Sequence, residues 1–125
     1  VHIEARTMVD MARRQILPAV EAYTAQLASA VAAKQAVAPS SGGCEIRQIE
    51  ALSDLTEQIS DAVDALASSL AVYRGIEDIT EAADLIRDQV LPRMAALRAP
   101  CDEAETYMPS DRWPFPTYGD LLFSE

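Results

Sequence analysis

The segment from Glu45 to Tyr73 carries apolar and acidic residues on opposite sides of one predicted helix. Its apolar residues are separated by three, four or seven positions: Ile49, Leu52, Ile59, Val63, Leu66 and Leu70. Acidic residues follow a similar spacing: Glu50, Asp54, Glu57, Asp61 and Asp64. At roughly 100° per residue the two sets lie about half a turn apart. The pattern predicts an amphipathic helix over residues 45–73, with one side in a core and the other facing water or a cationic partner.

Two further helices are predicted, one on each side of this segment. The first spans residues 3–37, with the apolar stripe Val9, Ala12, Ile16, Val20, Tyr23, Leu27 and Val31. The third spans residues 77–107, with the stripe Ile79, Ala83, Ile86, Val90, Met94, Leu97, Cys101 and Ala104. A Pro/Ser/Gly-rich loop and Arg74-Gly75 link the helices. Because short links make neighbouring helices antiparallel, we expect an all-α, up-down-up bundle of three long helices over residues 1–109.

Prolines lie inside two of the predicted helices. Gln15-Ile16-Leu17-Pro18 in the first is echoed by Gln89-Val90-Leu91-Pro92 in the third. An internal proline removes a hydrogen bond and bends a helix, so kinks at similar heights would let the bundle curve as a unit. So short an echo is weak evidence for an internal duplication. Pro100 is expected to kink or break the third helix before Cys101.

Residues 110–125 read as an extended aromatic tail. Its prolines oppose a helix, and a high density of aromatic rings seldom stays in water. We expect the tail to pack back along the bundle or against a neighbouring molecule. Because interface energy concentrates in aromatic residues, the docking candidates are Trp113, Phe115, Tyr118 and Phe123. The alternative is that these rings cover one end of their own bundle.

The net charge of −10 argues against nucleic-acid binding and against an anionic membrane surface. No uninterrupted apolar run approaches the roughly 20 residues of a membrane span. The polar start predicts no signal peptide, and we expect a cytoplasmic protein. Because the chain starts with Val1 and enters a helical pattern at once, it reads as a piece of a longer protein, with a processed terminus as the alternative.

No catalytic, cofactor-binding or metal site emerges from the residues. Cys44 and Cys101 are expected near the same end of the bundle, where a disulfide is sterically conceivable, although two reduced thiols are favoured. His2 is the single histidine and a poor candidate for a general base. The acidic stripe repeats along a face instead of converging on a point, which favours a solvated face over a cation site. Arg6, Arg13 and Arg14 read as ordinary surface charge or a small basic patch.

Two stretches resemble the carboxyl-terminal region of type III glutamine synthetases, the large bacterial form of that enzyme. One is Ile3-Glu4-Ala5-Arg6-Thr7-Met8-Val9-Asp10-Met11-Ala12 with Gln15-Ile16-Leu17-Pro18-Ala19-Val20. The other combines Val90-Leu91-Pro92-Arg93-Met94, Leu97-Arg98 and Asp102-Glu103-Ala104-Glu105 with the tail Trp113-Pro114-Phe115-Pro116-Thr117-Tyr118. The resemblance covers essentially the whole chain.

The resemblance implies a parent enzyme that joins ammonia to glutamate with ATP and Mg or Mn, assembled as a large double ring. The motifs for ATP, metal and glutamate lie upstream in that family, so no catalytic residue is carried over. The expected role is packing on the upstream catalytic domain and neighbouring subunits. Alternatives are a regulatory or partner-binding module acting through Glu50 to Asp64, or a free-standing helical adaptor. The chain by itself can also form a homo-oligomer that supplies a fourth helix.

Overall fold

A computed structural model describes residues 1–115, and the regular secondary structure of this part is entirely helical. The first helical segment consists of α1 (His2–Met11), the π-helical turn η1 (Ala12–Ile16) and α2 (Leu17–Val37). The second is α3 (Gly43–Arg74). The third consists of α4 (Ile79–Leu85), the π-helical turn η2 (Ile86–Val90) and α5 (Leu91–Glu105). The prediction of an all-α chain with three long helices is confirmed.

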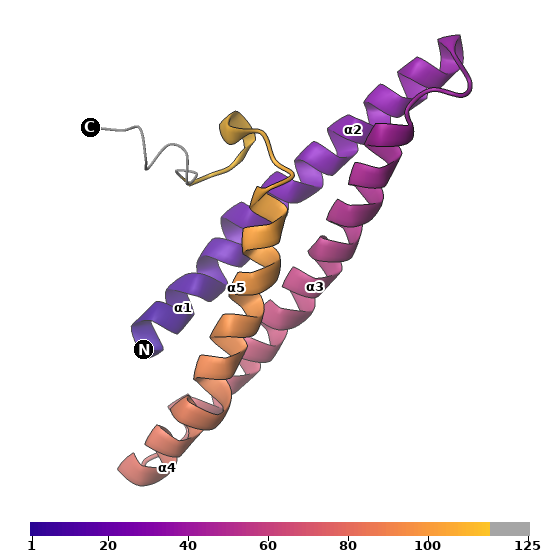
Figure 1. Cartoon of the computed structure of the whole chain (residues 1–125). Helices are drawn as coiled ribbons and strands as arrows, with labels where there is room; N and C mark the ends of the chain where they lie inside the picture. Colours follow the sequence, from indigo (N-terminus) through magenta and orange to yellow (C-terminus); the bar gives the residue numbers. More distant parts are fainter. Residues whose placement is uncertain (116–125) are drawn as a thin grey trace.

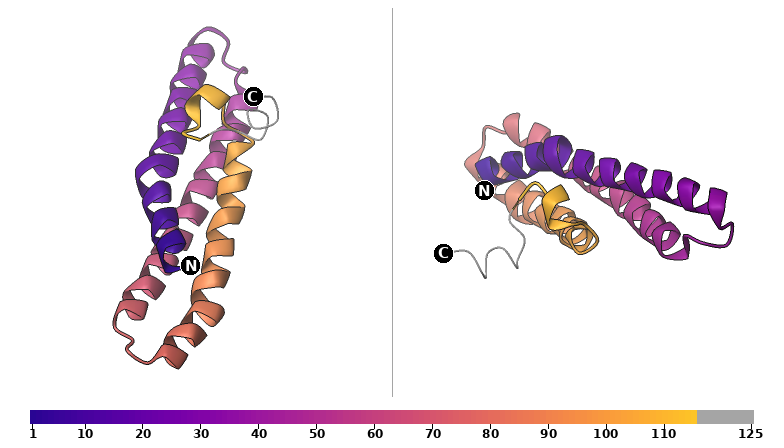
Figure 2. Two further views of the ribbon diagram at one scale, coloured as in Figure 1. Left: turned by 90° about the vertical axis from the view of Figure 1, so that its left-hand side faces the viewer. Right: turned by 90° about the horizontal axis from the view of Figure 1, so that it is seen from above.

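Helix α3 is the central element of the bundle. It packs against α1 and α2 along one side and against α5 along another (Figure 1). The chain turns back between α2 and α3 and again between α3 and α4. The hairpin of α2 and α3 extends beyond the end of α5, and α4 extends beyond the amino terminus, so the segments are staggered (Figure 2).

The core consists of apolar residues from all three segments. Val9, Ala12, Ile16, Val20, Leu27 and Val31 are buried, as are Leu52, Ile59, Val63, Leu66 and Leu70 of α3. In the third segment, the predicted core residues Ile79 and Ala83 are exposed, and Leu85 is buried in their place. Both residues lie in α4, which extends beyond the amino terminus of the first segment and contacts α3 at few points, so part of their surface is left uncovered (Figure 2).

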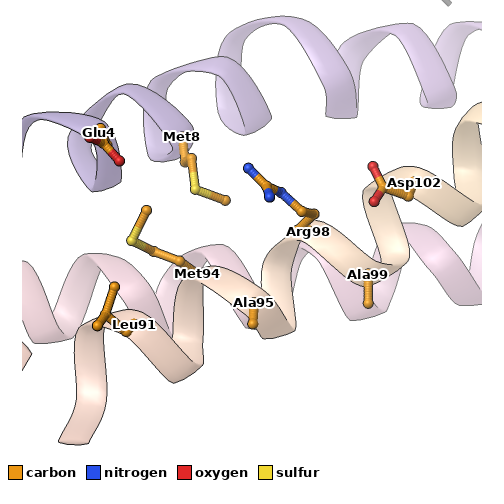
Figure 3. A pocket seen from close by; sticks show the side chains of 8 residues that line it. All are labelled: Glu4, Met8, Leu91, Met94, Ala95, Arg98, Ala99 and Asp102. Atoms are coloured by element: carbon orange, nitrogen blue, oxygen red, sulfur yellow. The ribbon is translucent and has the colours of Figure 1, made fainter. Parts of the chain in front are cut away.

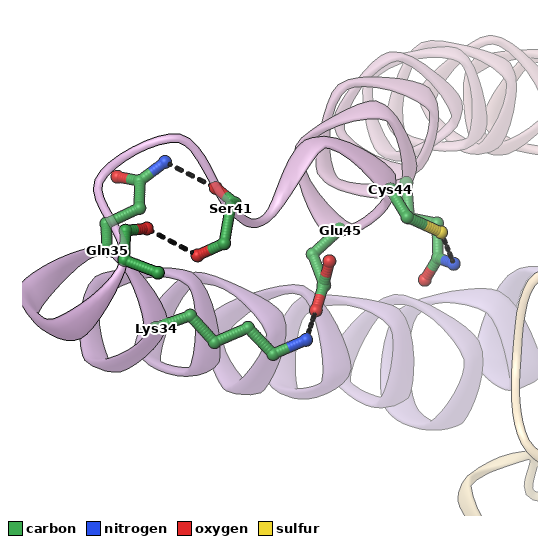
Figure 4. Close-up of polar contacts among 7 residues, drawn as sticks. Lys34, Gln35, Ser41, Cys44 and Glu45 are labelled. Carbon is green, nitrogen blue, oxygen red and sulfur yellow. Dashed lines mark hydrogen bonds and ion pairs between the residues drawn. The ribbon is translucent and has the colours of Figure 1, made fainter.

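The loop between α2 and α3 is held by local polar contacts (Figure 4). Gln35 Nε2 donates to the Ser41 carbonyl at 3.2 Å, and the Ser41 hydroxyl donates to the Ala38 carbonyl at 2.7 Å. Lys34 forms an ion pair with Glu45 across the loop, and this contact lowers the pKa of the Glu45 carboxyl. Gly42 precedes α3 with a φ of 90°, a left-handed conformation that favours glycine.

Pro18 and Pro92 each follow a π-helical turn. In η1 the Leu17 amide donates to the Ala12 carbonyl, five residues back, and in η2 the Leu91 amide donates to Ile86 in the same way. In an α-helix the ring of Pro18 would clash with the carbonyl four residues earlier, which belongs to Arg14 inside η1. The wider turn therefore accommodates the proline. Of the predicted kink or break before Cys101, the break is wrong, because α5 continues through Pro100 to Glu105.

Both π turns lie at the same level of α3. Arg13 of η1 donates to Asp64 at 3.0 Å, and Gln89 of η2 lies 3.4 Å from the hydroxyl of Ser69. Arg93, one turn after η2, donates to the Ala65 carbonyl at 2.8 Å and to the Ser69 hydroxyl at 2.5 Å. Polar contacts thus join the first and third segments to one stretch of α3.

By length and composition alone, the first segment is apolar enough to cross a membrane. An 18-residue window within His2–Val37 has a mean hydropathy of 1.2. The core helix of a soluble bundle meets the same criteria, and this segment packs along α3.

Candidate functional site

A groove runs between α1 and α5, which both pack on α3 but do not pack closely on one another. Its first half is a cavity of about 480 Å³ lined by Glu4, Met8, Leu91, Met94, Ala95, Arg98, Ala99 and Asp102. Met8 of α1 and Met94 of α5 face one another across it, with the Arg98 guanidinium beside them (Figure 3). Leu91 at its edge is 46% exposed. This half of the groove is apolar, open, and flanked by charges.

The second half of the groove is lined in part by aromatic rings. It is a cavity of about 250 Å³ that shares Met8, Arg98 and Asp102 with the first half. Its further lining residues are Met11, Ala12, Ile16, Leu97, Cys101, Glu105, Trp113 and Phe115. We call both halves together the α1–α5 groove.

Trp113 and Phe115 are half-buried against the bundle core. Their rings meet edge to face with centroids 6.4 Å apart. The chain reaches them through the 3₁₀ turn η3 (Ser110–Arg112), where the Arg112 amide donates to the Pro109 carbonyl at 3.0 Å, so the expected extended tail begins with a turn. Of the predicted docking residues, Trp113 and Phe115 line the groove, whereas Tyr118 and Phe123 lie outside the described residues.

The sequence spacing placed Met94 in the apolar stripe of residues 77–107 and gave no role to Met8, Met11 or Leu91. All four are groove residues. Spacing alone does not separate a residue at the centre of a stripe from one at its edge. The methionine content of the two helices was the available signal, because methionine is frequent at adaptable binding surfaces.

The predicted acidic partner face lies on the outside of α3. Glu50, Asp54, Glu57, Asp61 and Asp64 are all exposed. Asp64 pairs with Arg13, and Asp54 accepts a hydrogen bond from Gln58 at 2.8 Å. The acids thus form a solvated row, separate from the residues that line the α1–α5 groove.

The two cysteines are free and far apart. Cys44 is exposed at the start of α3, beside the loop, whereas Cys101 is buried at the level of Ile16. Ile16 and Lys34, which pairs with Glu45, are 18 residues apart, or about 27 Å along a helix. The prediction that both lie near the same end is therefore wrong, because the staggered α5 ends well before the hairpin does. Burial, and then the charge of Asp102, raise the pKa of the Cys101 thiol to about 11.

Within residues 1–115, no group of three or more His, Cys, Asp and Glu side chains is arranged to hold a metal ion. His2 stacks on Tyr73, with ring centroids 4.7 Å apart, and its Nδ1 is buried without a hydrogen-bond partner. The described part of the chain is a helical bundle with an apolar groove between α1 and α5.

Comparisons with known proteins relate this sequence to glutamine synthetases. The family described as the glutamine synthetase C-terminal domain matches residues 1–35. A glutamine synthetase of Butyrivibrio fibrisolvens is 29% identical over 127 residues, which covers 99% of this chain and 18% of the relative. A type-3 glutamine synthetase of Dictyostelium discoideum is 26% identical over 128 residues, which covers 98% of this chain and 17% of the relative. No solved structure gives a significant match.

The predicted resemblance to the carboxyl-terminal region of type III glutamine synthetases is therefore confirmed. The chain spans less than a fifth of the length of these two relatives.

Proposed function

We propose that this chain is a non-catalytic helical domain of a glutamine synthetase, and that it packs on the rest of the enzyme to support assembly of the oligomer. Its partners are the catalytic domain and neighbouring subunits. The parent enzyme would be cytoplasmic and would ligate ammonia to glutamate with ATP and Mg or Mn, using residues outside this chain. The similarity of nearly the whole chain to under a fifth of two glutamine synthetases carries the proposal.

The α1–α5 groove supports a packing role. Its lining includes Met8, Met94 and the half-exposed Leu91, together with Trp113 and Phe115. Aromatic and methionine side chains are enriched in the buried centres of protein interfaces. An open apolar groove of this kind gains stability when a second surface covers it.

A regulatory role is the second candidate, favoured by the exposed acidic row on α3. Five carboxylates on one helix face would attract a cationic partner over a range set by ionic strength. In this case, binding at α3 would change the kinetics of the catalytic domain without being needed for assembly.

Removing the chain from its parent enzyme distinguishes the two roles. The full-length enzyme is compared with a version that ends just before Val1, by light scattering and by the rate of glutamine formation. The packing role predicts that assembly and activity fall together. A shortened enzyme of normal size with altered kinetics would support regulation, and one unchanged in both would contradict both roles.

A further inference from the structure

Methionine is concentrated in the α1–α5 groove. The chain has four methionines. Met8, Met11 and Met94 line the groove, and Met108 is buried in the core. Methionine is unbranched and polarizable, so a surface built from it adapts to the side chains of a partner. The half-exposed Leu91 extends this apolar floor.

The charges around the groove are mainly negative. Glu4, Asp102 and Glu105 contribute three carboxylates, and Arg98 is the single cation among the lining residues. The chain as a whole has a net charge of −10, so the surrounding field has the same sign. The groove therefore combines an apolar floor with an acidic rim.

The shape of the groove suits a helix. It follows α5 from Leu91 to Asp102, which corresponds to about 17 Å, or three helical turns. It lies between two helices that share α3 but leave the seam between themselves open. A fourth helix laid along such a seam would convert the bundle into a four-helix arrangement.

Resting on the packing role proposed above, we propose that the α1–α5 groove receives an amphipathic helix that carries Lys or Arg, supplied by the catalytic part of the enzyme. Its apolar side chains contact Met8, Met94 and Leu91, and its cations lie near Glu4, Asp102 and Glu105. This is helix-in-groove recognition, in which apolar anchors give affinity and charges at the rim give orientation.

Charge argues against the two other possible occupants. A second copy of this chain carries the same negative net charge, so two acidic rims would repel one another. Residues 116–125 of the chain itself contain Asp120 and Glu125 and neither Lys nor Arg. Neither occupant complements the rim.

Trp113 provides a built-in reporter, because it is the single tryptophan and lines the groove. The 125-residue chain is titrated with an amphipathic Leu/Lys peptide of about 18 residues without tryptophan, and with a Leu/Glu peptide of the same pattern. The Leu/Lys peptide is expected to shift Trp113 emission to the blue and to saturate. The Leu/Glu peptide is expected to leave the emission unchanged.

Matched variants distinguish binding of the peptide in the groove from its non-specific attraction to an acidic protein. We expect Met8→Gln with Met94→Gln to weaken binding about tenfold, because interface energy concentrates in buried anchors. Val72→Gln, which changes an exposed apolar residue of α3, is the control. Asp102→Asn with Glu105→Gln should weaken binding more than Asp54→Asn with Glu57→Gln, which removes equal charge from the outer face of α3. Circular dichroism verifies that each variant is folded.

Three results would overturn the inference: unchanged Trp113 emission with the Leu/Lys peptide, equal binding of both peptides, or equal weakening by the groove and control variants. Self-association that the methionine variants abolish would identify a second copy as the occupant and would also overturn it. If removing the chain disrupts the enzyme while either peptide result fails, the packing role stands and only the identity of the occupant is wrong.

Discussion

At the scale of single residues, Ser69 is the most consequential polar group in the described part of the chain. It is fully buried in α3, yet its hydroxyl has Arg93 at 2.5 Å and Gln89 at 3.4 Å. Arg93 also donates to the Ala65 carbonyl at 2.8 Å. A buried hydroxyl needs such partners, because desolvating it without a hydrogen bond is unfavourable. These contacts fix the position of α5 along α3.

We expect Arg93→Met to lower the free energy of unfolding by about 1–3 kcal/mol, because Ser69 and the Ala65 carbonyl then lose a charged donor. Arg87→Met on the same helical segment is the control, since Arg87 pairs with Asp84 and Asp88 at the surface, where ion pairs contribute little. Urea unfolding measures both variants. Equal small changes for the two would show that the buried contacts of Arg93 do not stabilise the bundle.

At the scale of elements, the paired π turns are the feature that most shapes the helices. η1 and η2 each precede a proline, and each includes the residue whose carbonyl would otherwise meet the proline ring, Arg14 in one case and Asp88 in the other. A π turn is equivalent to an α-helix with one extra residue. The extra residue therefore allows the first and third segments to continue past Pro18 and Pro92.

A double-mutant cycle of Pro18 and Arg14 tests whether η1 accommodates the proline. Deleting Arg14 should convert η1 to regular α-helix and bring the ring of Pro18 against a carbonyl, which costs about 3 kcal/mol. Pro18→Ala should recover most of this loss in the deletion background and have a much smaller effect in the full chain. The coupling free energy is measured by urea unfolding of the four proteins. An effect of Pro18→Ala that is the same in both backgrounds would contradict the interpretation.

The sequence predicted where the helices lie better than which of their residues are buried. The stripe of Val9, Ile16, Val20 and Leu27 is buried as threefold and fourfold spacing predicts, even though it passes through η1. The same spacing failed at Ile79 and Ala83, because it does not show that α4 extends beyond the amino terminus of the first segment, and Ile79 is 85% exposed. The predicted apolar stripe of residues 45–73 also omitted Leu55, which is buried beside Leu52 and Ile59.

Other features could not be predicted from local pattern because they depend on how the segments are staggered. The separation of Cys44 from Cys101 follows from α5 ending at the level of Ile16, and spacing in the sequence does not define that level. The groove was anticipated only through Trp113 and Phe115. Met8, Met94 and Leu91 belong to it because α1 and α5 stay apart on the surface of α3.

At the scale of the whole molecule, the bundle combines a shared apolar core with an open seam between α1 and α5. Core residues of α3 pack against both neighbouring segments, and the polar contacts of Arg13 and Arg93 join each neighbour to α3. The seam between α1 and α5 is apolar, is flanked by acidic residues, and is lined in part by the half-buried rings of Trp113 and Phe115. The chain covers under a fifth of the length of its two relatives. An open apolar surface of this kind is expected on a part of a protein that packs against a larger partner.

Binding between the two separated parts tests the central claim most directly. The catalytic part of the parent enzyme is produced without this chain, the 125-residue chain is added, and analytical ultracentrifugation follows the size of both. We predict that the chain joins the catalytic part in a stoichiometric complex and restores the oligomer, and that Met8→Gln with Met94→Gln weakens the complex. Two species that sediment independently at concentrations well above those of the assembled enzyme would contradict the account.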